Sequence, residues 1–152
     1  MRILLVEDSP SDARLVQEAA KEVLLRVDIR VAHDGVEAMD WLRETESGRE
    51  YGPDLILLDL HLPKMSGREV LAEIKGSPRL KQIPVIVMTS SHSEQDVADV
   101  YALNANSYIA KPADLGGFIH TIEAIKEFWF LTATLPDGHS FAKAESLQTA
   151  PV

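Results

Sequence analysis

The sequence contains no cysteine, which excludes disulfide bonds and thiol chemistry. It has no apolar run of the roughly 18 residues that a membrane-spanning helix needs, so we expect no membrane contact. The apolar stretch within residues 1–6 is too short for a signal peptide, which predicts a cytoplasmic protein. Basic residues are also scarce. Fifteen Lys and Arg oppose 24 Asp and Glu, and a net charge of -9 argues against nucleic-acid binding because it repels phosphate backbones.

The length of 152 residues and the hydrophobic fraction of 45% suit one folded domain with a single core. Apolar periodicity is lost in the last stretch of the chain. We therefore predict a folded domain over residues 1–135 and a mobile C-terminal tail over residues 136–152.

Short apolar runs alternate with helical patterns along the chain. The runs predict strands buried on both faces of a sheet, at residues 3–6, 28–32, 55–58, 85–88 and 107–110. Apolar residues at helical spacing follow each run and predict helices that begin near Ser9, Val36, Val70, Ser93 and Asp114. This alternation is typical of an α/β protein, in which helices cover both faces of a parallel sheet.

Polar residues stand at the points where four of the predicted strands end. Glu7 and Asp8 follow the first strand, Asp59 follows the third, and Thr89 follows the core of the fourth. Lys111 follows the fifth strand. Because functional sites of parallel sheets lie outside the carboxyl ends of the strands, we expect these groups to converge on one rim.

Three carboxylates at one rim repel one another and need a cation to stay ionised. Lys111 offsets one charge, and a hard divalent ion such as Mg²⁺ offsets more, since it prefers carboxylate, carbonyl and water oxygens. Such a site also attracts phosphate, with Lys111 and the Thr89 hydroxyl placed to hold its oxygens. Asp59 is then a candidate nucleophile that forms an aspartyl phosphate.

With these features together, residues 1 to 130 resemble the receiver domain of response regulators in two-component signalling, of the chemotaxis-receiver type. The residues that carry this resemblance come in a fixed order: Glu7 with Asp8, Asp59, Pro63, Gly67, Thr89, and Lys111 with Pro112. The resemblance implies a flavodoxin-like (βα)5 fold, a doubly wound parallel sheet of five strands in the order 2-1-3-4-5. It also implies that Asp59 is the phosphoacceptor.

The resemblance further implies a metal site. Asp8, Asp59 and the backbone carbonyl of His61 would bind Mg²⁺ or another divalent cation directly, and Glu7 would act mainly through water.

The resemblance assigns the remaining site residues to the phosphoryl group. Thr89 and Lys111 would bind its oxygens, and a cis bond before Pro112 would aim Lys111. Tyr108 matches the aromatic switch position and would turn inward when Thr89 moves toward the phosphate. The surface of the fourth helix, fifth strand and fifth helix would then change its state.

A narrower resemblance, at residues 57–64, 67–75 and 127–132, is to the stand-alone receivers that partner with cyanobacterial phytochromes. It implies a light-sensing histidine kinase as partner, no output domain and a homodimer. Phe128, Trp129 and Phe130 are consecutive, so a helix cannot bury all three on one face. We interpret them as an exposed patch that pairs with a second copy. The alternative is a helix end that folds back over the core.

Two other functions stay open. The first is a Mg²⁺-dependent phosphatase with an Asp nucleophile, although His61 stands where such enzymes usually carry a second acid. The second is an interaction module that works without phosphorylation. Under the receiver hypothesis the chain is no conventional enzyme, and it catalyses at most its own phosphorylation and dephosphorylation.

Overall fold

The computed structural model describes residues 1–136. Apart from Pro136, the tail predicted for residues 136–152 lies outside the described residues. Within residues 1–136, none of the helices is both long enough and apolar enough to cross a membrane.

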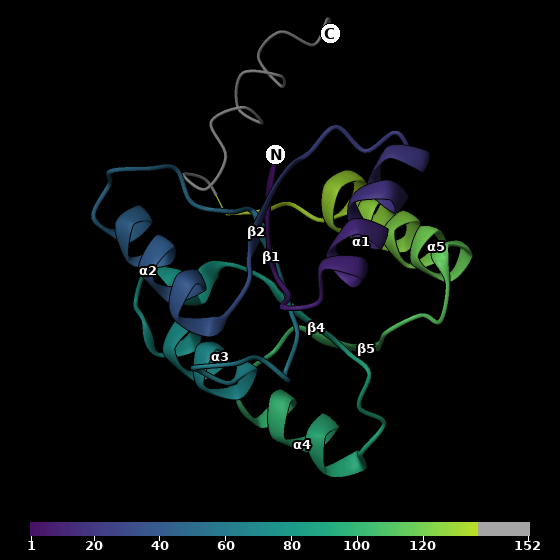
Figure 1. Cartoon of the computed structure of the whole chain (residues 1–152). Coiled ribbons are helices and arrows are strands. Elements are labelled where there is room, and N and C mark those ends of the chain that lie inside the picture. The colour runs from purple at the N-terminus through teal and green to yellow at the C-terminus, as the bar shows by residue number, and fades with distance from the viewer. Residues whose placement is uncertain (137–152) are drawn as a thin grey trace, which may run out of the picture.

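Five parallel strands form one sheet in the order β2-β1-β3-β4-β5, which confirms the predicted fold (Figure 1). The strands are β1 Arg2–Val6, β2 Asp28–Ala32, β3 Leu55–Leu58, β4 Val85–Thr89 and β5 Ser107–Ala110. Because every strand runs in the same direction, all five carboxyl ends lie at one edge of the sheet.

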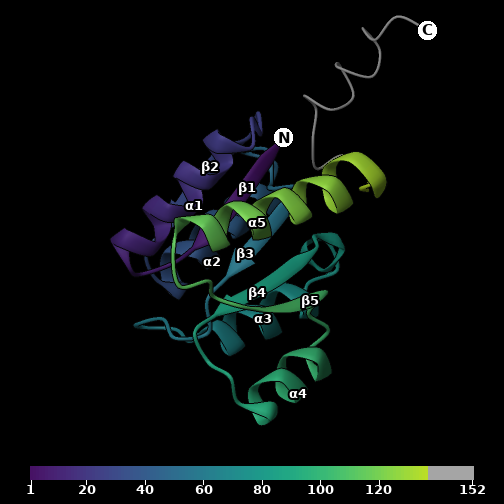
Figure 2. The ribbon, with the colours of Figure 1, turned by 90° about the vertical axis from the view of Figure 1, so that its right-hand side faces the viewer.

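Helices cover both faces of this sheet. Figure 2 shows α1 and α5 together on one face, with α3 behind the sheet, and residues of α2, α3 and α4 share the core on that opposite face. The helices are α1 Pro10–Glu22, α2 Gly35–Glu46, α3 Gly67–Gly76, α4 Glu94–Ala102 and α5 Leu115–Ile125. A short 3-10 helix, η1, spans Leu80–Gln82, and a π-helical segment, η2 (Lys126–Thr132), continues α5.

The apolar runs form strands because each face of the sheet has its own core. Along β1, Leu4 and Val6 pack into the core under α2, α3 and α4, whereas Ile3 and Leu5 pack into the core under α1 and α5. The four residues of β3 alternate in the same way and are all fully buried. A strand buried on both faces has no polar side, so its sequence reads as a continuous apolar run.

Side-chain caps set where each α-helix begins. In every case the cap side chain accepts a hydrogen bond from the backbone N–H three residues later, and the caps are Ser9, Asp34, Ser66, Ser93 and Asp114. Such caps satisfy backbone donors that the first helical turn leaves free. Since each α-helix follows a strand, these capped ends lie at the same edge as the carboxyl ends of the strands.

Close packing of α3 fixes the loop that follows β3. The Gly67 N–H donates to the Leu60 carbonyl at 2.9 Å. A Cβ atom at Gly67 would lie 2.1 Å from the Asp59 carbonyl oxygen, a distance that no side chain tolerates. Glycine at this position therefore lets the start of α3 rest directly on the backbone that carries Asp59.

Candidate functional site

The rim at the carboxyl ends of the strands brings the predicted site residues together. Glu7 follows β1 and Asp59 follows β3, and both side chains are buried. Thr89 is the last residue of β4 and is also buried, while Lys111 follows β5. Asp8 is exposed beside Glu7. The convergence expected from the strand ends is therefore present.

The Lys111 ammonium lies among three carboxylates. Its Nζ is 2.5 Å from Glu7 Oε1, 2.8 Å from Asp12 Oδ2 and 2.8 Å from Asp59 Oδ2. Only 11% of the Lys111 side chain is exposed. An ammonium has three N–H donors, so the three carboxylates match its full donor set.

Burial and charge pull the pKa values of this cluster in opposite directions. Burial by itself would raise the pKa of Asp59, but the hydrogen bond and charge of Lys111 outweigh it and hold that pKa below its usual range. Burial raises the pKa of Glu7 to about 7, against the hydrogen bond from Lys111 and with the help of the Asp59 charge. Burial would lower the pKa of Lys111, yet its hydrogen bonds to Asp12, Asp59 and Glu7 raise it.

Carboxylates outnumber the Lys111 ammonium at this rim. Burial, helped by the Asp59 charge, keeps the pKa of Glu7 raised although Lys111 is in contact with it. Carboxylate oxygens of Glu7, Asp8 and Asp59 all lie within 4.8 Å of one another. Carboxylates this close are the oxygen ligands that hard divalent cations prefer, so the residues present fit such an ion.

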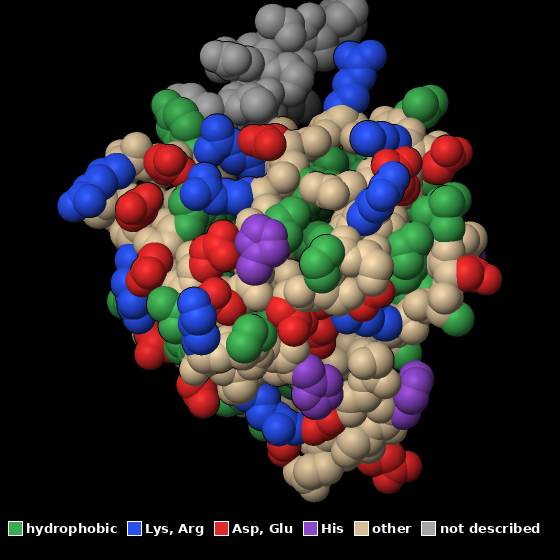
Figure 3. All heavy atoms as spheres, in the orientation of Figure 1, with side chains coloured by type: hydrophobic (Ala, Val, Ile, Leu, Met, Phe, Trp, Pro, Cys, Tyr) green, Lys and Arg blue, Asp and Glu red, His purple; other side chains and the backbone are tan. Residues whose placement is uncertain are grey.

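Charged side chains of both signs cover the face of the molecule drawn in Figure 3. Acidic and basic groups are mixed there, with hydrophobic groups scattered between them. At the rim, by contrast, two of the acids are buried.

Thr89 places a hydroxyl close to Asp59. Its Oγ1 is buried and satisfies the geometry of no hydrogen bond among residues 1–136, although the hydroxyl helps to lower the pKa of nearby Asp59. Buried hydroxyls without a hydrogen-bond partner are uncommon, because no hydrogen bond in the protein then offsets the free energy lost when the group leaves water. An oxygen atom bound beside Asp59 would satisfy this donor.

The loop after β3 also turns toward Asp59. The backbone N–H of His61 donates to Asp59 Oδ1 at 3.2 Å, and the His61 side chain is exposed. The role of the His61 carbonyl as a metal ligand stays a prediction.

Tyr108 lies in an inward position. Its hydroxyl donates to the backbone carbonyl of Ser91 at 2.6 Å, and its ring packs against the core under α2, α3 and α4. Ser91 is two residues after Thr89, and its hydroxyl donates to Asp96 of α4. Asp96 in turn pairs with Arg68 of α3. Tyr108 is therefore tied to the backbone that follows Thr89 and, through it, to α4.

The prediction of a cis bond before Pro112 is wrong. No peptide bond in residues 1–136 is cis. The trans form is favoured by about 0.5–1 kcal/mol even before proline. With that bond trans, Lys111 still reaches all three carboxylates, so a cis bond is not needed to aim its side chain.

Asp12 is the site residue that the sequence did not reveal. Its position, three residues after the Ser9 cap, suggested only the start of a helix. A signal was nevertheless present, because the first turn of a helix that follows β1 must lie at the rim. An acidic residue there faces the same charges as Glu7.

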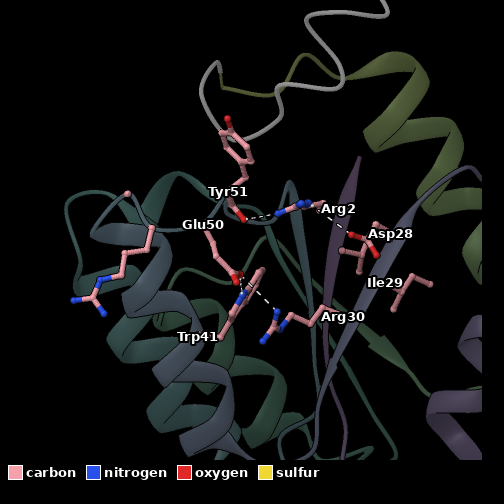
Figure 4. A pocket seen from close by; sticks show the side chains of 10 residues that line it. Arg2, Asp28, Ile29, Arg30, Trp41, Glu50 and Tyr51 are labelled. Carbon is pink, nitrogen blue, oxygen red and sulfur yellow. Dashed lines mark hydrogen bonds and ion pairs between the residues drawn. The ribbon is translucent and has the colours of Figure 1, made fainter.

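At the opposite edge of the sheet, a cavity of about 600 Å³ lies at the amino ends of β1 and β2 (Figure 4). Glu50 accepts a hydrogen bond from Trp41 Nε1 at 2.5 Å and pairs with Arg30, which stacks over the Trp41 ring. Arg2 lies over the Tyr51 ring. Arg2, Arg30 and Glu50 of this cavity thus each have a partner.

This sheet order, with an acidic cluster, a buried threonine and a lysine at its carboxyl edge, defines the phosphoacceptor class of α/β signalling domains. The family model described as the response regulator receiver domain matches residues 3–123, and the chain belongs to that family.

Two response regulators, Rcp1 and RcpA, are similar to most of this chain in sequence and in structure. The chain is 48% identical over 135 residues to response regulator Rcp1 of Synechocystis sp., covering 88% of this chain and 92% of that protein. The solved Mn²⁺-bound form of Rcp1 covers 89% of this chain and 98% of its own, with a TM-score of 0.80. The phosphorylated cyanobacterial phytochrome response regulator RcpA is 48% identical, with a TM-score of 0.83, and covers 90% and 98%.

The acidic cluster predicts how stability responds to a divalent cation. With Mg²⁺ at one hundred times its Kd, we expect the free energy of unfolding of the wild type to rise by about 2.7 kcal/mol. Asp8→Asn should gain much less, but without the cation it should be at least as stable as the wild type, because one repulsive charge is gone. Urea unfolding with and without Mg²⁺ measures both effects.

The matched control is Asp40→Asn, which removes an exposed charge on α2. It should respond to Mg²⁺ as the wild type does. An undiminished response of Asp8→Asn would show that Asp8 does not bind the cation.

Proposed function

We propose that the chain accepts a phosphoryl group on Asp59 from a sensor histidine kinase of the phytochrome type, with Mg²⁺ as the cation. The observation that supports this most is the contact of Lys111 with Asp59 at 2.8 Å, beside a buried Thr89 hydroxyl that satisfies the geometry of no hydrogen bond within residues 1–136. The relative RcpA supports the phytochrome partnership, since it is described as a cyanobacterial phytochrome response regulator.

The chemistry needs a nucleophile and groups that hold the transferred oxygens. An Asp59 oxygen attacks phosphorus, a P–O bond forms, the P–N bond to the kinase histidine breaks, and the released imidazole nitrogen takes up a proton. Lys111 and Thr89 hold phosphoryl oxygens, because one is a cation in contact with Asp59 and the other a buried hydroxyl donor beside it. A bound cation would neutralise charge on Glu7, Asp8 and Asp59 while the anionic group approaches.

The relay from phosphate to surface runs through Thr89 and Tyr108. A phosphoryl oxygen that draws the Thr89 hydroxyl toward it moves the start of the loop that contains Ser91, the residue that Tyr108 holds. The inward Tyr108 then favours one position of α4, and a differential interaction of a few kcal/mol is enough to shift such an equilibrium. The affected surface comprises α4, β5 and α5. Separately, a cytoplasmic location for the protein stays a prediction.

The rival functions have less support. A phosphatase with an Asp nucleophile needs an acid near position 61, and the His61 side chain is exposed there. An interaction module without phosphorylation has no need of a lysine held by three carboxylates at the end of a sheet.

The residues after α5 support a homodimer, but the exposed apolar patch is not the three consecutive aromatic residues that the sequence suggested. Phe128 is 54% exposed and Leu131 is 70% exposed. Trp129 and Phe130 instead pack partly against the core under α1 and α5, as a helix end that folds back would do. We propose Phe128 with Leu131 as the patch that meets a second copy, with Trp129 and Phe130 as its support.

Phosphotransfer from a purified, autophosphorylated phytochrome-type histidine kinase tests the main proposal. In Mg²⁺ we expect intact mass spectrometry to show one phosphoryl adduct, stable in acid and labile in base. Asp59→Asn should show none, whereas Asp40→Asn should match the wild type. Absence of the adduct from both the kinase and a small phosphodonor would contradict the proposal.

Sedimentation tests the dimer. Replacing Phe128 with Ser should weaken the dimer at least about tenfold, because losing a buried aromatic contact costs more than about 1.4 kcal/mol. Val36→Ser, at an exposed apolar position on α2, is the matched control and should leave association unchanged. A wild type that stays monomeric with and without phosphorylation would contradict the dimer proposal.

A further inference from the structure

Lys111 has two kinds of carboxylate partner. Glu7 and Asp59 belong to the acidic cluster whose oxygens fit a divalent cation, together with Asp8. Asp12 is in contact with the Lys111 ammonium at 2.8 Å but does not belong to that cluster. Its side chain is 30% exposed and comes from the first turn of α1.

The position of Asp12 outside the acidic cluster matters when a cation binds or when Asp59 is phosphorylated, because both change the charge of the site. A divalent cation would take up oxygens of the acidic cluster, and a phosphoryl group on Asp59 would replace that carboxylate with new anionic oxygens. Both changes would compete with the contacts that Lys111 has with Glu7 and Asp59. Asp12 lies outside the acidic cluster, so its contact with Lys111 would not be exposed to that competition.

A lysine needs such an anchor more than a rigid group would. Its ammonium is a point charge on a flexible four-carbon stem, so holding it in one place costs rotamer freedom. A fixed partner outside the reacting atoms supplies that restriction before the phosphoryl group arrives.

We propose that Asp12 is a positioning residue that holds the Lys111 ammonium at the phosphoryl oxygens during transfer, without binding the cation. This inference rests on the proposed phosphorylation of Asp59. It adds a fourth carboxylate to the site, in a role that acts only through Lys111.

The helix itself does not need this carboxylate. The backbone N–H of Asp12 donates to Ser9 Oγ at 3.3 Å, and that cap uses no side-chain atom of Asp12. The variant Asp12→Asn therefore keeps the cap and nearly the same shape while removing the charge. Glu18→Gln removes one charge from the same helix at a residue paired with Lys21, and serves as the matched control.

A double-mutant cycle tests the inference with phosphoramidate as donor in saturating Mg²⁺. At saturating donor we expect Asp12→Asn to lower the phosphorylation rate constant about fivefold or more, as loss of a charged hydrogen bond does. In a Lys111→Ala background the same change should alter the rate constant by less than about twofold, because its target is gone. Glu18→Gln should match the wild type.

Two further measurements separate positioning from other roles. The Mn²⁺ affinity of Asp12→Asn, from the spin-resonance signal of the free ion, should stay within about twofold of the wild type. The ammonium resonance of Lys111 in lysine-selective NMR should be resolved in the wild type and broadened in Asp12→Asn, because an unanchored ammonium exchanges its protons faster.

Each contrary result is distinct. Equal rates for Asp12→Asn and the wild type, or additive effects in the cycle, would overturn the inference while leaving phosphorylation of Asp59 intact. A parallel loss of Mn²⁺ affinity would make Asp12 a metal ligand and also overturn it. A wild type that gains no phosphoryl group would overturn the proposed function and this inference with it.

Discussion

The Lys111 ammonium, surrounded by the carboxylates of Glu7, Asp12 and Asp59, is the interaction on which the rest of the site depends. It keeps Asp59 ionised despite burial, which a nucleophile requires. Burial nevertheless keeps the pKa of Glu7 raised to about 7 against the Lys111 contact, and a cation bound at the rim would stabilise its ionised form. The excess of carboxylates over ammonium groups at this edge of the sheet suits it to a divalent cation, and then to a phosphoryl group held beside that cation.

The parallel sheet makes that arrangement possible. Residues far apart in the sequence meet because β1, β3, β4 and β5 all end at one edge. Gly67 lets α3 press against the backbone of Asp59, and the inward Tyr108 binds the loop after Thr89. Local chemistry at Asp59 is thereby connected to α4, the element that a partner protein would detect in our proposal.

The residue pattern predicted the strands and most of the rim, because buried parallel strands read as apolar runs and polar residues mark their ends. The order of the strands came from the resemblance to receiver domains. The sequence missed Asp12, since a residue in a helix cap pattern has a sufficient local explanation and its contact with Lys111 spans the whole fold. It was wrong about Pro112, where the trans bond already lets Lys111 reach its partners. It treated three aromatic residues alike, whereas the π-helical turn of η2 exposes Phe128 and tucks Trp129 and Phe130 against the core.

Chemical location of the modification tests the central claim most directly. Borohydride reduces an aspartyl phosphate to homoserine, so peptide mapping of the phosphorylated and reduced protein identifies the acceptor residue. The account predicts homoserine at position 59 alone, because Asp59 is the carboxylate in contact with both Lys111 and the loop of His61. Homoserine at position 8 or 12 instead, or an unmodified Asp59 in a phosphorylated chain, would contradict it.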